Sequence, residues 1–138
     1  MKLRTRQTSE IDLTKPFILD SNPDLASRVH GEFDKTVKSP YSFEYYDSSW
    51  ELELMSDLEK DNSVKKWTKN HGIVIPYWDE DGKLRGFKPD FLVEKDDGSK
   101  ELIEIKGKHL LPTFKRKMGA AEEWCKARKM GFRVISKY

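Results

Sequence analysis

The stretch FKPDFLVEKDDGSKELIEIKGK, residues 87–108, contains two short apolar runs separated by the turn signal DDGS. Apolar runs on either side of an Asp- and Gly-rich tetrapeptide are typical of two strands joined by a turn. Side chains alternate between the faces of a strand, so Glu104 and Lys106 share one face of the second strand. In the first strand the same alternation places Asp90 on the face of Leu92. If the strands are neighbours, Asp90 and Glu104 converge.

This convergence predicts a metal site. Two carboxylates that are held close together repel each other, and a divalent cation between them relieves the repulsion. Mg²⁺ prefers hard oxygen ligands, which Asp90 and Glu104 both supply. Lys106 lies one pleat beyond Glu104 and is expected to face the same ion.

A third carboxylate lies on a predicted helix over about residues 49–61. Helical spacing puts Glu53 on the outer face and Glu51 at the centre of an apolar stripe made by Leu54, Met55 and Leu58. A buried acid costs several kcal/mol unless it is paired or bound to a metal, which makes Glu51 a candidate ligand. The alternative is a capping box, in which Ser48 and Glu51 satisfy the helix N-terminus. Position alone leaves both interpretations open.

The remaining segments predict an α/β fold. Four of them are expected to be extended, namely residues 63–70, 71–78, 84–95 and 100–107. A second helix is predicted over residues 112–130, ending at Gly131, with an apolar stripe made by Phe114, Met118, Ala121 and Cys125. A last strand, FRVIS, follows. The order is therefore a helix, three or four strands, a helix and a strand.

Length and composition predict one domain. The chain has 138 residues, of which 36% are hydrophobic, and this is enough for a single core. Residues 41–138 are expected to form the domain and residues 1–40, which show little periodicity, an arm or irregular layer. No apolar run approaches the roughly 20 residues of a membrane span, and the N-terminus lacks a secretory signal. These features predict a cytoplasmic protein that does not engage a membrane.

The cysteine and histidine content argues against disulfide and zinc sites. A lone cysteine, Cys125, cannot form an internal disulfide. His71 and His109 have no Cys or His partner at zinc-ligand spacing, so neither is predicted to bind zinc.

Charge is unevenly distributed although the net charge is only +2. Residues 41–107 hold 10 basic and 16 acidic side chains, whereas residues 108–138 hold 9 and 2, which gives −6 and +7. A basic segment next to an acidic one suits a protein that binds a polyanion and concentrates carboxylates for metal ions. Two solvated surfaces would give the same pattern, so charge alone does not decide between these readings.

The spacing of these residues resembles a known nuclease signature. Pro89-Asp90 followed by Glu104-Ile105-Lys106 is similar to the motif of the PD-(D/E)xK superfamily, and Glu51 matches an acid that the superfamily often carries on an upstream helix. The blocks SSWE, VIPY, KPDFLVE and LIEIKGK look most like a branch with transposon endonuclease subunits, phage junction-resolving endonucleases and phage head-completion nucleases. The resemblance covers roughly residues 44–137. It implies a restriction-endonuclease-like core, a central mixed sheet flanked by helices in the order α-β-β-β-α-β.

The resemblance also implies a function, a Mg²⁺-dependent DNA endonuclease that hydrolyses phosphodiester bonds. Catalytic residues would be Glu51, Asp90, Glu104 and Lys106, and the metal ligands would be Asp90, Glu104, Glu51 and the carbonyl of Ile105. Mn²⁺ is expected to substitute for Mg²⁺. DNA is the expected partner, contacted by Lys108, Lys115, Arg116 and Lys117, and a second copy of the chain or a partner protein is also expected.

Three alternatives keep the same fold. An exonuclease of the recombination type usually carries a Gln on the helix after the catalytic strand, but Gln7 is the one Gln of this chain, which favours an endonuclease. A resolvase of branched DNA would use the same residues. A non-catalytic DNA-binding or assembly subunit would keep the fold and act through a partner.

Overall fold

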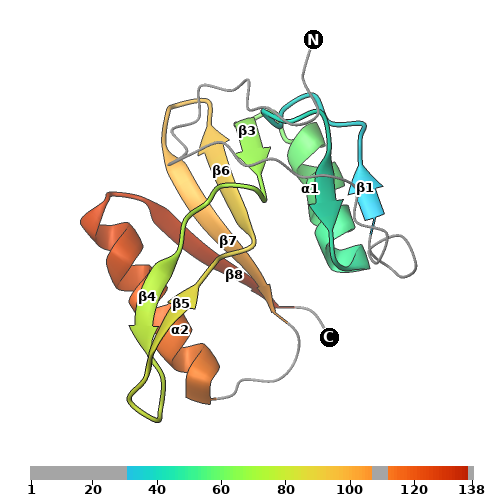
Figure 1. Cartoon of the computed structure of the whole chain (residues 1–138). Coiled ribbons are helices and arrows are strands. Elements are labelled where there is room, and N and C mark those ends of the chain that lie inside the picture. The colour runs from blue at the N-terminus through green and yellow to red at the C-terminus, as the bar shows by residue number, and fades with distance from the viewer. Residues whose placement is uncertain (1–30, 107–111, 137–138) are drawn as a thin grey trace.

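The computed structural model describes residues 31–106 and 112–136. Within these ranges the chain forms two helices and eight strands (Figure 1). In chain order they are β1 (Gly31–Phe33), β2 (Glu44–Tyr46), α1 (Ser49–Lys60), β3 (Val64–Thr68), β4 (Ile75–Trp78), β5 (Leu84–Phe87), β6 (Phe91–Lys95), β7 (Lys100–Lys106), α2 (Pro112–Ala127) and β8 (Gly131–Ser136).

The main sheet has four strands in the order β3-β6-β7-β8. β6 pairs antiparallel with β3 and β7, whereas β7 and β8 run parallel, so the sheet is mixed. A parallel pair needs a long crossover connection, and α2 supplies it between β7 and β8. The helices and the main sheet therefore follow the order α1-β3-β6-β7-α2-β8, which confirms the predicted α/β core.

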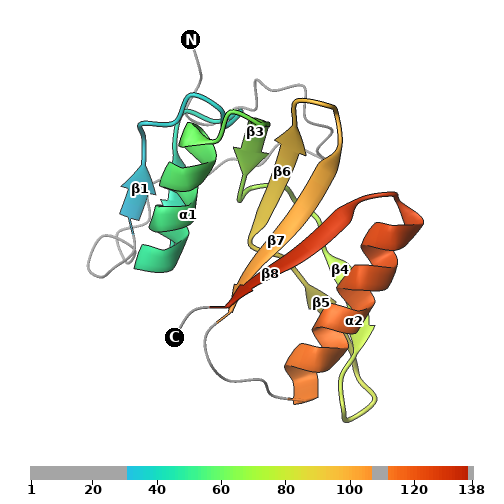
Figure 2. The same ribbon diagram turned by 180° about the vertical axis from the view of Figure 1, so that it is seen from behind.

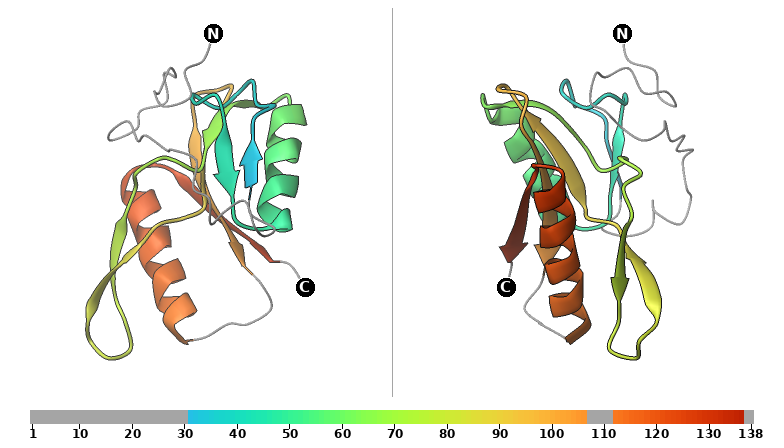
Figure 3. Two further views of the ribbon diagram at one scale, coloured as in Figure 1. Left: turned by 45° about the vertical axis from the view of Figure 1, so that its right-hand side comes forward. Right: turned by 90° about the vertical axis from the view of Figure 1, so that its left-hand side faces the viewer.

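A β4–β5 hairpin interrupts this order between β3 and β6. It projects from the main sheet and lies along α2 in every view (Figures 2 and 3). Five strands thus separate the helices, and the prediction of three or four was wrong. The predicted segment 84–95 splits into two strands at Lys88-Pro89-Asp90, because Pro has no backbone N–H to continue a ladder.

Three glycines fit the backbone geometry and packing of the hairpins. Gly82 and Gly98 have φ of 77° and 86°, a backbone conformation that glycine adopts without strain, in the predicted DEDG and DDGS turns. In the β4–β5 hairpin, a side chain on Gly86 would lie 2.7 Å from Val74 Cγ1. Glycine at position 86 therefore leaves room for the side chain of Val74.

Alternation along β6 divides the core between the two faces of the sheet. Phe91 and Val93 pack on the side of α1, whereas Leu92 packs on the side of α2. Full burial of such a side chain contributes about 1.5–3 kcal/mol. The α1 side also buries Leu54, Met55, Leu58, Val64, Trp67 and Ile103, and the α2 side Ile73, Ile75, Tyr77, Phe87, Leu102, Phe114, Met118, Ala121 and Cys125.

Helix α1 follows its predicted bounds closely. Its N-cap is Ser48, whose Oγ accepts the Glu51 N–H at 3.2 Å. The buried residues of α1 are Glu51, Leu54, Met55 and Leu58, and Glu53 is exposed. The predicted stripe, including its inward carboxylate, is confirmed.

Helix α2 ends earlier than predicted. The stripe of Phe114, Met118, Ala121 and Cys125 is buried as expected, but the helix ends at Ala127. Lys129, with φ of 56°, takes the left-handed capping position, and the N–H groups of Lys129 and Met130 donate to the carbonyls of Lys126 and Cys125. Gly131 begins β8. The helix therefore ends three residues before the predicted end at residue 130, and Lys129 takes the capping position that was predicted for Gly131.

The predicted arm lies mostly outside the described residues, because residues 1–30 are among those not described. β1 follows directly and pairs with β2 across the predicted boundary at residue 40, which itself stays a prediction. Neither helix of the described segments is long and apolar enough to cross a membrane.

Candidate active site

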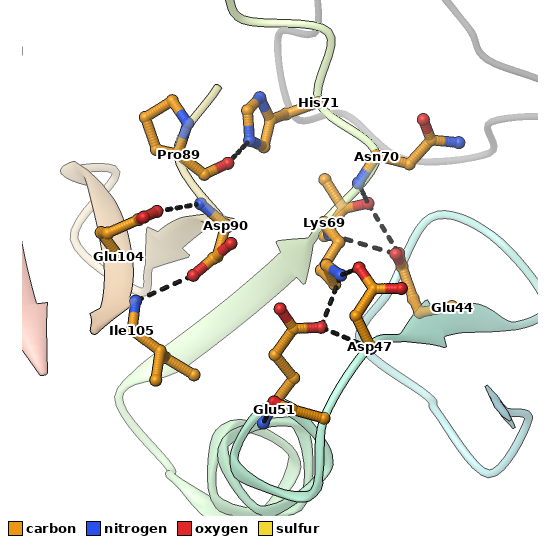
Figure 4. Close-up of polar contacts among 12 residues, drawn as sticks. Glu44, Asp47, Glu51, Lys69, Asn70, His71, Pro89, Asp90, Glu104 and Ile105 are labelled. Atoms are coloured by element: carbon orange, nitrogen blue, oxygen red, sulfur yellow. Dashed lines mark hydrogen bonds and ion pairs between the residues drawn. The ribbon is translucent and has the colours of Figure 1, made fainter. Parts of the chain in front are cut away.

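Asp90 and Glu104 meet where β6 begins and β7 ends. The register pairs Phe91 with Ile103, which places Asp90 beside Glu104. The Asp90 N–H donates to Glu104 Oε1 at 3.1 Å, and the Ile105 N–H donates to Asp90 Oδ2 at 2.8 Å (Figure 4). We call Asp90 and Glu104 the strand pair. The predicted convergence of these two carboxylates is confirmed.

The strand pair carries more negative charge than its surroundings balance. Burial raises the pKa of the Glu104 carboxyl, and the neighbouring Asp90 charge raises it further. Burial also raises the pKa of Asp90, against the bond from the Ile105 N–H, and the Glu51 charge adds to the rise. The Glu104 carboxyl therefore resists ionisation while Asp90 is charged.

His71 anchors the backbone that carries Asp90. Its ring is fully buried, and its Nδ1 accepts the Ile73 N–H at 2.9 Å, so the proton is on Nε2. Nε2 donates to the carbonyl of Pro89 at 2.7 Å. Burial lowers the pKa of His71 to about 4, which keeps the ring neutral at neutral pH. The ring thus fixes the peptide that precedes Asp90.

Glu51 is held on the other side of the site by Lys69. Lys69 Nζ lies 2.6 Å from Glu51 Oε1 and 3.0 Å from Asp47 Oδ2, and the Asp47 N–H donates to the same Glu51 oxygen at 2.7 Å. Burial opposes the charge of Lys69, but the carboxylates of Glu51 and Asp47 outweigh it and raise the pKa of the ammonium. We call Glu51 and Lys69 the helix pair.

The capping interpretation of Glu51 is partly right. Ser48 caps the helix through the Glu51 N–H, as a capping box requires. The Glu51 carboxylate, however, bonds to the N–H of Asp47 rather than to that of Ser48. The geometry leaves one carboxylate oxygen free of these bonds, on the side of Asp90 (Figure 4).

The segment after β3 is anchored through Glu44. This carboxyl is fully buried and accepts from the hydroxyls of Ser39 and Thr68 and from the Lys69 N–H at 3.1 Å. Burial raises the pKa of Glu44 to about 7, against these hydrogen bonds. The backbone position of Lys69 is therefore fixed independently of its ammonium group.

Two lysines lie on the α2 side of the strand pair. Lys106 lies two residues after Glu104 on the same face of β7, and its Nζ lies 5.0 Å from the centre of the Phe114 ring. Lys117 Nζ lies 5.6 Å from the centre of the Phe87 ring, and its charge offsets part of the rise in the Glu104 pKa.

The other predicted DNA contacts are less closely placed. Lys115 and Arg116 are exposed on the first half of α2. Lys108 lies outside the described residues.

The carboxylates of Asp90, Glu104 and Glu51 are ligands that fit a hard cation, although the three side chains are not clustered. Within residues 31–106 and 112–136, no three His, Cys, Asp or Glu side chains lie close enough to hold a metal ion. The reason is that Glu51 is bound to Lys69 and Asp47 instead of joining the strand pair. The unbalanced charge of Asp90 and Glu104 is what a divalent oxygen-liganded cation would neutralise.

Sequence reasoning missed Lys69, His71 and Glu44. Lys69 and His71 belong to the segment TKNH, which includes the last residue of β3, and Thr68, Asn70 and His71 are all buried. Glu44 lies on β2 and accepts the Lys69 N–H. Their partners come from distant parts of the chain, so spacing alone could not have identified them.

A mixed sheet with a helix on each face, an Asp at the start of one central strand and Glu-x-Lys at the end of the next define a PD-(D/E)xK nuclease domain with a restriction-endonuclease-like fold. Residues 61–137, more than half of the chain, match the family described as TnsA-like endonuclease N terminal. The chain belongs to this family, whose members are transposon endonuclease subunits of that superfamily.

The matched range contains Asp90, Glu104 and Lys106 but begins after Glu51. No curated protein and no solved structure matches the chain.

Proposed function

We propose that the protein is a Mg²⁺-dependent DNA endonuclease that hydrolyses phosphodiester bonds. The observation that carries this proposal is the strand pair, two half-buried carboxylates with raised pKa values next to Lys106. Membership of the TnsA-like endonuclease family supports nuclease activity. A buried acidic pair that only stabilised the fold would be paired with cations rather than with each other.

The proposal assigns a role to each residue of the site. Asp90, Glu104, Glu51 and the carbonyl of Ile105 would hold the cation, which when bound supplies a Lewis acid at the scissile phosphate. The ammonium group of Lys106 would orient the attacking water, whose proton would pass to solvent, and would offset the charge that builds on the phosphate oxygens. Its compact ammonium group suits a task at a single point.

The basic residues of α2 would hold the DNA backbone. Lys115 and Arg116 are exposed on the same half of α2 as Lys117, which reaches toward Glu104. Phosphate contacts dominate nucleic-acid affinity, so this half of the helix would place the backbone next to the strand pair. Family membership further supports a role as the endonuclease subunit of a transposon, working beside a transposase partner.

Cleavage of supercoiled and branched DNA tests the proposal. We expect Mg²⁺ to support nicking of supercoiled circles, EDTA to abolish it, and Lys106→Ala to slow it by about 100-fold or more. Lys95→Ala is the matched control and should cleave normally, because Lys95 lies at the end of β6 that is far from Asp90. Circles have no ends, so nicking them excludes an obligate exonuclease, and a strong preference for branched DNA would indicate a resolvase.

Binding without cleavage under all of these conditions would instead indicate a non-catalytic subunit and contradict the proposal.

The role of α2 is tested separately by Lys115→Ala with Arg116→Ala. We expect weaker DNA binding on every sequence and a salt dependence that is shallower by roughly 0.9 in log–log slope for each phosphate that the helix no longer neutralises. Lys126→Ala, at the other end of α2, is the control, and an unchanged slope in the double variant would show that the first half of α2 does not bind DNA.

A further inference from the structure

The ammonium group of Lys69 occupies a position that a metal ion would also favour. Its Nζ contacts one carboxylate oxygen each from Glu51 and Asp47, at 2.6 and 3.0 Å. The side chain is 15% exposed, so these contacts are largely shielded from water. Asp90 is near enough for its pKa to be affected by both Glu51 and Lys69. Two acidic side chains thus contact one internal cation, and a third, Asp90, lines the same cavity.

We infer that Lys69 is a positioning residue that holds Glu51 in the metal-free protein, so that a divalent cation which takes Glu51 as a ligand competes with the ammonium group for that carboxylate. The inference rests on the proposed function, because it takes Glu51 as a metal ligand. It goes further by naming the group that competes with the metal.

The contacts of Glu51 support a displaceable hold. Lys69 and the Asp47 N–H both bind the same oxygen, Oε1, and the other oxygen lies on the side of Asp90 (Figure 4). Glu51 is therefore already aimed at the strand pair but kept apart from it. This explains why the described residues contain no three-carboxylate cluster although Glu51 is near enough to raise the pKa of Asp90.

The surroundings of Lys69 allow its ammonium group to move without disturbing the fold. Its backbone N–H is fixed to the buried Glu44, so only the flexible stem has to shift. A cavity of about 240 Å³ lies next to it, lined by Asp47, Lys69, Lys88, Pro89 and Asp90. Asp47 is 54% exposed and can keep the ammonium group as a partner after Glu51 leaves.

Direct Mn²⁺ binding to the full chain without DNA tests the inference, measured by calorimetry or by the paramagnetic signal of free Mn²⁺. Lys69→Met removes the competing charge but keeps the length of the stem. We expect it to tighten Mn²⁺ binding by about tenfold, the scale of one hydrogen bond between charged groups. In a Glu51→Gln background the same substitution should leave the affinity unchanged, since Lys69 acts through Glu51.

Lys88→Met is the matched control, because it removes one positive charge from the same cavity. An equal gain in Lys88→Met, or an equal gain with and without Glu51, would show a general charge effect and overturn the inference. Weaker or unchanged binding in Lys69→Met would overturn it too. If Lys69→Met fails to fold, Lys69→Gln keeps a hydrogen-bond donor for Glu51 and Asp47 and is measured in the same way.

The outcomes separate the inference from the proposed function. Wild-type protein that binds no Mn²⁺ would overturn both. Wild-type protein that binds Mn²⁺ through the strand pair, with no coupling between Lys69 and Glu51, would overturn the inference alone.

Discussion

The strand pair and the helix pair place acidic side chains in the same site in opposite electrostatic states. In the strand pair, Asp90 and Glu104 lie against each other and each accepts one backbone N–H, and both pKa values rise. In the helix pair, Glu51 has the ammonium of Lys69 at 2.6 Å. The difference shows which half of the site lacks positive charge before any cation binds.

This difference affects the stability of the fold and, under the proposed function, the binding of a cation. Burying like charges together destabilises a fold, whereas burying an acid with an ammonium partner and a backbone donor has little net effect on stability. Under the proposed function, a cation bound at the strand pair would relieve this repulsion. The helix pair would then supply a further carboxylate without adding a second uncompensated charge.

The largest expected effect comes from breaking the strand pair. Glu104→Gln keeps an oxygen that can accept the Asp90 N–H but removes one charge. We expect DNA cleavage to fall by about 1,000-fold or more, because a cation ligand is removed, while the melting temperature of the metal-free protein rises. Nicking assays and thermal melts measure the two effects.

The matched control for this prediction is Glu101→Gln, on the same strand. Glu101 pairs with Arg133 at 3.2 Å near the surface, so its substitution should leave cleavage intact and lower stability slightly. A Glu104→Gln protein that melts well below wild type would mean that its activity disappeared with the fold, and would contradict the repulsion of the strand pair.

An intermediate effect is expected from releasing the backbone of the strand pair. His71→Leu leaves the Pro89 carbonyl and the Ile73 N–H without their buried partner, at a cost of about 1–3 kcal/mol in unfolding free energy. His71→Gln can still donate toward Pro89, whereas His71→Asn can replace only the acceptor for Ile73. We therefore expect cleavage to be retained better by Gln than by Asn at equal stability.

The pH dependence of the His71 variants sharpens this prediction. The folded pKa of about 4 lies below the ordinary 6.5, so the stability that depends on the neutral ring is present above pH 6.5 and is lost as the pH falls toward 4. Denaturant titrations of wild type and His71→Gln should differ in this window. Cleavage that is the same in the Gln and Asn variants would show that the Pro89 bond does not position Asp90.

The smallest expected effect on cleavage comes from the anchor of the helix pair, because Glu44 bonds to the Lys69 backbone and not to the strand pair. The folded pKa of Glu44, about 7, lies above the ordinary 4.5, so its contribution to stability is present below pH 4.5 and is lost as the pH rises through 7. Glu44→Gln should remove this loss, which amounts to at most about 1.4 kcal/mol per pH unit. Relative to wild type, the variant should therefore become more stable as the pH rises from 4.5 to 7.

Urea titrations across this range test the Glu44 prediction. Glu122→Gln, which removes the same formal charge from an exposed position of α2, is the control. A difference between wild type and Glu44→Gln that stays constant with pH would show that the buried carboxyl of Glu44 remains ionised throughout.

The sequence was informative where contacts are local or periodic. Alternation in residues 87–108 predicted that Asp90 and Glu104 converge, and they meet through a hydrogen bond between β6 and β7. Helical spacing predicted the inward position of Glu51. These predictions succeeded because the direction of a side chain follows from the geometry of its own element.

The sequence was uninformative where a side chain takes its partner from a distant element. Glu51 was left open between capping and metal binding, since neither pattern contains Lys69, which lies 18 residues further along the chain. His71 had no partner at zinc-ligand spacing, and its actual partner is a backbone carbonyl, which no residue pattern reveals. The end of α2 was misplaced because Lys129 adopts a conformation that usually favours glycine.

The pairing of β7 has a consequence for the order in which the protein assembles. Its antiparallel contact with β6 closes through a short turn and joins Asp90 to Glu104 across 14 residues, whereas its parallel contact with β8 must wait for the whole of α2. Short loops close faster than long ones, so we expect the acidic strands to form before the basic helix is docked. Pulsed hydrogen exchange during refolding should then protect β6 and β7 before β8, and simultaneous protection would argue against it. A chain emerging from the ribosome would thus complete its acidic pair before the basic helix has emerged.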